Sequence, residues 1–501
     1  MISRPFQKNF RSGEDVIMLR LNTDRTSGLE ISKPNWIPTT PLKNMSQTEY
    51  DVLIVGTGAG GGAVLWRLCE QWRNNGKKIG VIEAGGLVLP TNLRNIETMN
   101  PARANDLAYN TPGLFIPVSG TRLRQMIALG GRTLAWNAVT PRMYLTAQDW
   151  PVPIREMELY YKIAEQAMNV SDSYVNGSPT NQIFLNRLWN NGFAHAMNMP
   201  TATDLQPTKY GELHSNVYFS SISFLAQALY RRPYDLAVFS RAVRVLADKG
   251  KIEGVEVMTP EKKSYVLKAK KVILCTSTIE TPRLLLYSGI PGHSIGHYLT
   301  THSLVGGPQK INRELYPYVL GTIGILLPQI AGIPFQIQID GPTRTQFYHN
   351  KDIPLQSEEE IYFNGVGVVQ TRYENRITLN PYERDYFGVP KVEIHVSYTT
   401  EDINNLGMAE HALKNVAAAL GFGTAHFGRQ EIIAGDHESC TCRMGEDPAT
   451  SVTNRFGQIH GVSGLFVADN SVLPSLKAAN PTLTTVALAI RTADYIVRTT
   501  V

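Results

Sequence analysis

A glycine-rich turn lies between a short apolar segment and a helical one near residue 56. Residues 50–62 read YDVLIVGTGAGGG, in which Gly56, Gly58 and Gly61 have the spacing GxGxxG. The first glycine permits a tight turn, the second lets backbone approach a pyrophosphate, and the third lets the helix pack on the strand. The N-terminus of the helix offers unpaired N–H groups and a partial positive charge to phosphates. The pattern therefore predicts the start of a dinucleotide-binding βαβ unit.

The stretch after this turn completes the unit. Residues 63–72 have helical apolar spacing, residues 77–83 form a second strand-like segment, and Glu83 ends it, 22 residues after Gly61. A carboxylate at that position accepts hydrogen bonds from a ribose diol and disfavours a 2′-phosphate, so NADP is not expected. FAD and NAD both remain possible, although the continuation Glu-Ala-Gly-Gly favours FAD. The alternative is a structural glycine-rich turn with a surface glutamate.

The composition narrows the class of protein. At 501 residues the chain is longer than one hydrophobic core usually grows, which predicts two closely joined domains. A net charge of +5 gives no reason to expect a nucleic acid as partner. The sequence shows no secretory signal, no run of ~18 apolar residues for a membrane span and, with Cys69, Cys275, Cys440 and Cys442, no disulfide framework. We expect a cytoplasmic protein with reduced cysteines and no metal site.

The remaining elements predict an interrupted cofactor-binding domain. Pieces of the dinucleotide-binding type recur along the chain, as strands at 236–257, 272–275 and 465–468 and helices at 278–288 and 481–497. Between them lie strand-like runs at 361–371, 376–379 and 391–398 and a helix at 401–420. The predicted boundaries are an N-terminal arm at 1–49, a cofactor-binding domain at 50–150, 210–300 and 431–501, and a substrate-binding domain at 151–209 and 301–430. The arm is expected to wrap the surface or to make oligomer contacts.

Three further segments resemble the glucose–methanol–choline (GMC) oxidoreductases, a family of FAD enzymes that oxidise alcohols. Residues 128–144 (ALGGRTLAWNAVTPRMY) look like the Gly-Gly loop of the family, and their ending is similar to the pyranose oxidase and sugar dehydrogenase branch. Residues 272–290 are similar to its second motif, with Thr281-Pro282 opening a helix. The most specific segment, 437–496, includes HESCTCRMG and NPTLTTVALAI. The resemblance implies an α/β fold with a discontinuous Rossmann-like FAD-binding domain and a second, α+β substrate domain on a mostly antiparallel sheet.

The resemblance also implies a catalytic pair. In the family the substrate hydroxyl gives its proton to a histidine, which His437 matches, while the hydride on the carbon that bears the hydroxyl goes to flavin N5. Asn480, 43 residues later, matches the partner of that histidine. A neutral imidazole can accept a proton, and an amide can hold the substrate oxygen without competing for that proton. Alternatively, His437 caps a loop, and Asn480 acts as the N-cap of a helix that has Pro481 at its first position. His460 is expected to be structural.

Further positions match the flavin contacts of the family. Asp469 and Asn470 match residues near the ribityl chain and pyrophosphate, and Val243 matches a backbone contact to adenine. A strand-terminating turn and an ordinary strand valine are the alternatives. Arg142 is expected to contact the flavin or to form an ion pair. The full set expected to bind the cofactor is Gly56, Gly58, Ala59, Gly61, Glu83, Gly130, Gly131, Thr133, Asn137, Val243, Asp469, Asn470, Pro481 and Thr482.

Ala135 is a departure from the pyranose oxidases, in which the corresponding loop carries a histidine bound covalently to the flavin. Because alanine has no nucleophile, we expect FAD to be bound non-covalently. The branch favours a sugar-like alcohol as substrate. If the acidic segment Glu358–Glu360 borders the entrance, it favours an amino sugar or an aminoglycoside precursor.

Two other functions remain possible. A sterol or lipid alcohol oxidase would need an apolar cavity, which the segment 323–339 could line. A lyase-type or binding protein of this fold would hold flavin without oxidising anything. The electron acceptor, oxygen or another, and the formation of a homo-oligomer stay open.

Overall fold

The computed structural model describes residues 35–96, 125–207, 214–312, 323–341, 358–423, 425–429 and 437–500. Most of the predicted arm therefore lies outside the described residues. Among the residues described, no helix combines the length and the apolar character needed to cross a membrane. All four cysteines are buried and free.

The glycine turn follows a strand of a parallel sheet. Its strands lie in the order β20 (Leu465–Val467), β12 (Val272–Leu274), β2 (Val52–Val55), β3 (Ile79–Ile82) and β8 (Asp235–Ala237). These strands are short, apolar and almost entirely buried, as expected of a parallel sheet. Strand β12 pairs with both β2 and β20, so segments far apart in the sequence form one sheet. This is the α/β arrangement that the sequence predicted.

Helices pack closely beside this sheet. Helix α2 (Ala59–Gln71) begins in the glycine turn and packs against α9 (Thr482–Arg498) and α6 (Ser221–Arg231). Helix α4 (Ile154–Ala167) also packs against α9. A Cβ on Gly62 would lie 2.0 Å from Ser221 Oγ, so the absence of a side chain on Gly62 permits the contact between α2 and α6.

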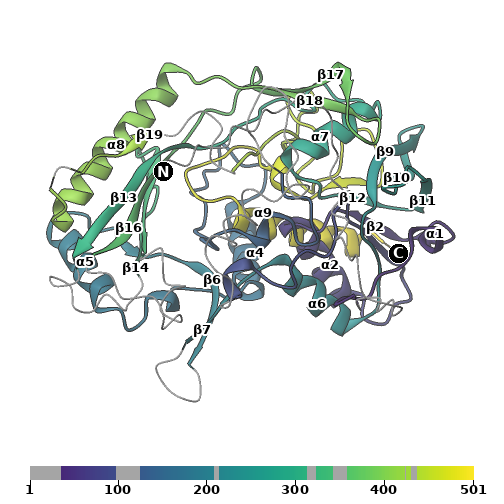
Figure 1. Ribbon diagram of the computed structural model, residues 1–501. Coiled ribbons are helices and arrows are strands. Elements are labelled where there is room, and N and C mark those ends of the chain that lie inside the picture. Colours follow the sequence, from purple (N-terminus) through teal and green to yellow (C-terminus); the bar gives the residue numbers. More distant parts are fainter. Residues whose placement is uncertain are drawn as a thin grey trace, which may run out of the picture.

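A second sheet is antiparallel. Its strands lie in the order β19 (Gly428–Arg429), β13 (Ser303–Asn312), β16 (Glu358–Gly367), β15 (Phe335–Gly341), β14 (Ile323–Leu327) and β5 (Met197–Asn198). Helix α8 (Thr400–Leu420) covers its outer face and shares an apolar core with it (Figure 1). The N-cap Thr399 and Asp402 form a capping box that fixes the start of α8.

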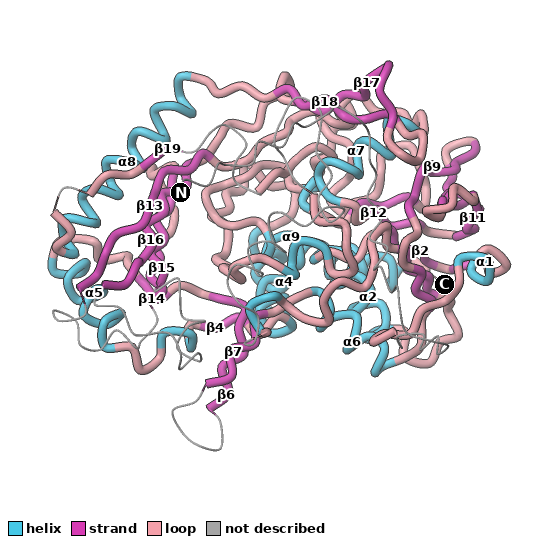
Figure 2. The backbone as a smooth tube through the Cα atoms, in the orientation of Figure 1, coloured by secondary structure: helices cyan, strands magenta, loops and turns pink. Residues whose placement is uncertain are grey.

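Smaller elements connect or flank the two sheets (Figure 2). A meander of β9 (Arg241–Asp248), β10 (Lys251–Met258) and β11 (Ser264–Ala269) carries the parallel strand β1 (Glu49–Tyr50). Strands β6 (Thr201–Pro207) and β7 (His214–Tyr218) form a projecting hairpin next to β4 (Val170–Ser171). The others are β17 (Arg376–Arg384), β18 (Pro390–His395), α1 (Leu42–Met45), α5 (Pro179–Asn190), α7 (Ser277–Tyr287) and the 3₁₀ turns η1 (Leu93–Asn95), η3 (Gly131–Leu134), η4 (Ser173–Val175) and η6 (Asn470–Val472).

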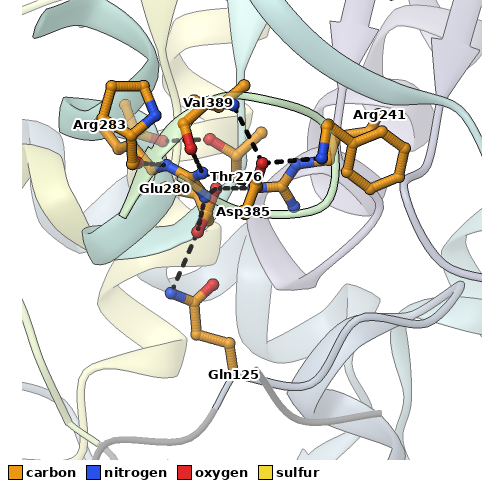
Figure 3. A network of polar contacts seen from close by, with 10 residues as sticks. Gln125, Arg241, Thr276, Glu280, Arg283, Asp385 and Val389 are labelled. Atoms are coloured by element: carbon orange, nitrogen blue, oxygen red, sulfur yellow. Dashed lines mark hydrogen bonds and ion pairs between the residues drawn. The ribbon is translucent and has the colours of Figure 1, made fainter. Parts of the chain in front are cut away.

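A buried ionic network ties the β17–β18 hairpin to α7 and β9 (Figure 3). Arg283 on α7 contacts Glu280 at 3.1 Å and Asp385, between β17 and β18, at 2.6 Å. Arg241 on β9 contacts the same two carboxylates at 2.8 and 3.3 Å. Gln125 donates to Glu280 at 3.4 Å. Two cations thus balance two carboxylates in a largely buried cluster.

Replacement of Arg283 by methionine is expected to lower the free energy of unfolding by about 3–5 kcal/mol, because it leaves two buried carboxylates short of a partner. Replacement of the exposed Lys391, which pairs with Glu383 at 3.2 Å, by methionine serves as the control and should change it by about 0–1 kcal/mol. Urea unfolding followed by tryptophan fluorescence measures both. Equal losses in the two variants would contradict the importance of the network.

Candidate active site

Each glycine of the GxGxxG turn has a different surrounding. Gly56 has a φ of +96°, and a Cβ on it would lie 2.4 Å from the carbonyl oxygen of Cys275. A Cβ on Gly61 would lie 2.0 Å from the Gly56 carbonyl oxygen, so a side chain would push α2 away from β2. At Gly58, in contrast, a Cβ would meet nothing within 4 Å. Gly58 thus borders open space at the N-terminus of α2, where a phosphate would be stabilised.

The Gly-Gly loop faces this turn. A Cβ on Gly131 would lie 3.3 Å from the Cα of Gly58, and the Gly130 amide donates to Thr57 Oγ1 at 3.0 Å. Thr133 donates to the Gly130 carbonyl at 2.6 Å and accepts from the Ser221 amide at 2.8 Å. The hydroxyl of Thr133 therefore holds the loop in place.

The carboxylate of Glu83 holds the same turn in place through hydrogen bonds. Its Oε2 accepts from the Thr57 amide at 3.1 Å and from Thr57 Oγ1 at 2.6 Å, and its Oε1 accepts from the Gly85 amide at 2.9 Å. Burial raises the pKa of Glu83, and these hydrogen bonds oppose the rise. Because each carboxylate oxygen has two acceptor sites, Glu83 retains capacity for a further donor such as a ribose hydroxyl.

The end of β20 lies against α2 and α7, and β9 packs against α7. Asp469 is buried, which raises its pKa, and it accepts from the Ser277 amide at 3.0 Å and from Thr281 Oγ1 at 2.6 Å. Asn470 Nδ2 donates to the carbonyl of residue 438 at 3.5 Å. The pairing of β9 with β10 shifts by one residue at Val243, which places the Val243 backbone outside the ladder.

Residues 437–444, the histidine strip, are held by backbone contacts on both sides. Ser439 exchanges hydrogen bonds with Thr300 at 2.9 and 3.2 Å. Cys440 has a φ of +77°, which is uncommon for a residue other than glycine and persists because its neighbours fix it. Arg132 of the Gly-Gly loop pairs with Glu438 at 2.6 Å. The strip is therefore joined to the loop that faces Gly58.

Helix α7 anchors the strip through a proline. It begins at Ser277, so the prediction that Thr281-Pro282 opens the helix was wrong. Pro282 has no N–H to donate to the Thr278 carbonyl one turn earlier. That carbonyl instead accepts from Thr441 Oγ1 at 2.6 Å, and Thr278 Oγ1 donates to the Glu438 carbonyl at 2.7 Å.

The structure brings His437 and Asn480 together. Asn480 Nδ2 lies 3.4 Å from His437 Nε2, and Asn480 Oδ1 accepts from Gln336 Nε2 at 3.1 Å and from Gln338 Nε2 at 2.6 Å. The prediction of Asn480 as helix cap was wrong, because the N-cap of α9 is Pro481 and the helix begins at Thr482. The amide of Asn480 is directed to the imidazole instead.

A second histidine, which the sequence did not single out, completes this group. His302 Nδ1 lies 2.8 Å from His437 Nδ1, and His302 Nε2 lies 2.6 Å from the carbonyl oxygen of Lys477. Burial, together with the nearby His437, lowers the pKa of His302 to about 3, and burial, together with the nearby Arg132, lowers the pKa of His437 to about 4. Both imidazoles are therefore neutral near neutral pH. No local pattern marks His302, since its contact spans 135 positions of sequence.

Strand β15 presents a polar face next to Asn480. Gln336, Gln338 and Asp340 alternate along β15 and so share one face, whereas the isoleucines between them enter the apolar core. Burial raises the pKa of the half-buried Asp340 to about 6, against the opposing charge of Arg94. Arg94 also donates to the exposed Asn137 at 2.5 Å. Arg94 thus connects Asn137 with Asp340, the last residue of this polar face.

Arg142 and His460 both have partners in the structure that fit a structural role. Arg142 forms ion pairs with Glu158 and Glu165 on α4 at 2.6 and 2.5 Å. His460 Nε2 lies 3.0 Å from Ser451 Oγ.

The acidic segment begins the strand that pairs with β15. Glu358 begins β16 and pairs with Lys310 at 2.9 Å. It lies six positions from Asn364, the cross-strand neighbour of Gln338, which is roughly 20 Å along a strand. That this segment borders the active site stays a prediction.

Comparisons with known proteins identify proteins that are similar to this chain. Two family models described as GMC oxidoreductase match residues 135–304 and 371–489, together more than half of the chain. A C-glycoside 3-oxidase of Arthrobacter globiformis is 28% identical over 390 residues, covering 74% of this chain and 73% of that protein. A paromamine 6′-oxidase of Streptomyces fradiae is 25% identical over 301 residues, or 54% of each chain. The solved structure of Aspergillus oryzae formate oxidase has a TM-score of 0.63 at 15% identity, covers 90% of this chain and 98% of that one, and shows the shared fold.

Proposed function

Because this chain belongs to the GMC oxidoreductase family, we propose that it oxidises a hydroxyl group of a sugar-like alcohol to a carbonyl with FAD as cofactor. The observation that carries the proposal is the contact between His437 and Asn480 beside the two glycine-rich loops. The open space at Gly58 fits a pyrophosphate, since no atom of the described residues lies within 4 Å of the place that a Cβ would take. The N-terminus of α2 and the carboxylate of Glu83 supply the partners for phosphate and ribose.

His437 and Asn480 act on the same substrate oxygen. The neutral imidazole accepts the hydroxyl proton at Nε2, and Asn480 Nδ2 donates to the oxygen and holds it beside the imidazole. Bound FAD supplies the acceptor for the hydride from the carbinol carbon. Arg132, near the imidazole, adds positive charge where the substrate oxygen becomes negative as its proton leaves.

Two observations favour a sugar-like substrate. The names of the two relatives give a C-glycoside and paromamine, both compounds with sugar hydroxyls. The face formed by Gln336, Gln338 and Asp340 presents hydrogen-bonding groups next to Asn480. The lipid alternative would need the apolar residues of the segment 323–339 to line a cavity. Ile323, Ile325 and the isoleucines of β15 are instead packed in the core with α8, so they give no support to a lipid substrate.

Anaerobic titration of the FAD-loaded protein tests this function. Glucose, a C-glucoside, paromamine and cholesterol would be added separately while flavin absorbance is followed. We expect bleaching by at least one sugar and none by cholesterol. Bleaching by cholesterol alone would establish the lipid function, and a lack of bleaching by all four would support a role without oxidation.

FAD is expected to leave the protein on acid precipitation. Ala135 occupies the position where a flavin-linked histidine would stand, and alanine forms no bond to the flavin. Absorbance of the supernatant at flavin wavelengths measures the release. Flavin that remains in the washed pellet would show a covalent link elsewhere in the loop.

The preference for an amino sugar is expected to rise with pH. The raised pKa of Asp340, about 6, means that its carboxyl is neutral below that pH and anionic above it. A substrate ammonium is attracted only to the anionic form. The ratio of kcat/KM for paromamine over glucose should therefore increase through about pH 6, and Asp340→Asn should make it independent of pH. An increase that persists in Asp340→Asn would exclude Asp340 as the cause.

A further inference from the structure

We infer that His302 is a positioning residue that fixes the direction of a hydrogen-bond chain through the active site and thereby keeps the Nε2 lone pair of His437 available for the substrate proton. The inference rests on the proposed role of His437 as base. The chain of contacts runs from the Lys477 carbonyl through His302 and His437 to Asn480 and ends at Gln336 and Gln338.

The Lys477 carbonyl sets the direction at one end. A backbone carbonyl only accepts, so His302 Nε2, at 2.6 Å from it, carries a hydrogen and donates. His302 is buried with 1% of its surface exposed and lies against a second imidazole, with ring centroids 4.8 Å apart. These surroundings keep it neutral, and a neutral imidazole has one N–H. His302 Nδ1 is therefore an acceptor.

This acceptor determines the tautomer of His437. His437 Nδ1, at 2.8 Å from His302 Nδ1, must donate to it. A neutral His437 then has its lone pair on Nε2, the nitrogen that faces Asn480 Nδ2 at 3.4 Å. Asn480 Oδ1 is left to accept from Gln336 and Gln338. Every donor in the chain meets an acceptor.

Without the carbonyl the chain would have two equivalent directions. Each amide has both a donor and an acceptor end, and an imidazole exchanges the roles of its nitrogens by moving one proton. In the reversed direction His437 Nε2 would carry the hydrogen and could not accept one from the substrate. The fixed carbonyl of Lys477, transmitted by His302, selects the productive direction.

His302 also supports His437 after the proton has been taken. His437 then carries a positive charge, and its Nδ1–H still donates to the neutral His302. Loss of this charged hydrogen bond should slow flavin reduction about 10- to 100-fold. The effect is smaller than that of removing the base itself, because His437 remains.

Variants of His302 separate positioning from packing. His302→Leu removes both hydrogen bonds and should show the 10- to 100-fold loss, with FAD content unchanged. His302→Gln can donate from its amide nitrogen to the Lys477 carbonyl and accept from His437 at its amide oxygen, so it should recover most of the rate. His460→Leu, which loses a histidine contact away from the site, is the control with no expected change. Equal rates in His302→Leu and the unmodified enzyme, or equal losses in the leucine and glutamine variants, would overturn the inference.

A direct readout of the tautomer needs no substrate. In FAD-loaded enzyme containing ¹⁵N-histidine, we expect a protonated, pyrrole-type Nδ1 and an unprotonated, pyridine-type Nε2 for His437, with its signals identified by their loss in His437→Gln. A protonated Nε2 would overturn the inference. If His437→Gln reduces its flavin as fast as the unmodified enzyme with glucose, the C-glucoside or paromamine, the proposed role of His437 as base fails instead, whatever the tautomer. If no sugar reduces the flavin of the unmodified enzyme, the proposed oxidation of a sugar fails.

Discussion

Replacement of His437 by alanine is expected to leave FAD bound and to slow flavin reduction by the substrate about 10²–10⁴-fold, the usual contribution of a general base. The proton of the substrate hydroxyl would then have no acceptor beside Asn480. The expected cofactor contacts at Gly58, Glu83 and Asp469 lie in other segments, so FAD content should not change. Stopped-flow mixing without oxygen gives the reduction rate, and the absorbance spectrum gives the FAD content.

His460→Ala is the matched control for this loss, because it removes an imidazole from the same C-terminal region. It should reduce its flavin at the rate of the unmodified enzyme. An unchanged rate in His437→Ala would show that another group takes the proton.

Replacement of Gly58 by valine is expected to abolish FAD binding. A side chain at this position projects into open space beside the N-terminus of α2, where the pyrophosphate is expected, so the protein can fold while the cofactor is excluded. Flavin absorbance per protein after purification measures the loss, and circular dichroism shows whether the fold is retained.

The control for Gly58→Val is Gly407→Val. Gly407 lies in α8, and a Cβ on it would meet its nearest neighbour, Arg429, at 4.0 Å. This variant adds the same side chain away from both glycine-rich loops and should retain FAD. A folded Gly58→Val protein with a full complement of flavin would contradict the placement of the pyrophosphate.

The parts of the fold that the sequence predicted are those set by local patterns. The glycine turn, its two flanking strands and the helix at 401–420 follow from short-range spacing, and the structure contains each of them. The recurrence of dinucleotide-type segments predicted that distant parts of the chain share one domain, but the pairing of β12 with both β2 and β20 was not predicted. Helix α6 was not predicted, although its contact with Gly62 fixes the position of α2.

The parts that the sequence missed depend on contacts between distant segments. Gln336 and Gln338 look like ordinary strand residues in the sequence. Their role becomes visible only from their hydrogen bonds to Asn480, more than 140 positions later. His302 acquires its role only because folding places it between Lys477 and His437. The acidic residues near 358 were more conspicuous in the sequence, and the structure places them at the start of β16.

The most direct test of the account is anaerobic flavin reduction by a sugar carrying hydrogen or deuterium on the carbinol carbon that is oxidised. We predict complete bleaching of the flavin, a lower rate with deuterium because that C–H bond breaks in the step, and loss of the fast phase in His437→Ala. Flavin absorbance that stays unchanged with every sugar tested, while the protein is folded and loaded with FAD, would contradict the claim that this chain oxidises a sugar-like alcohol.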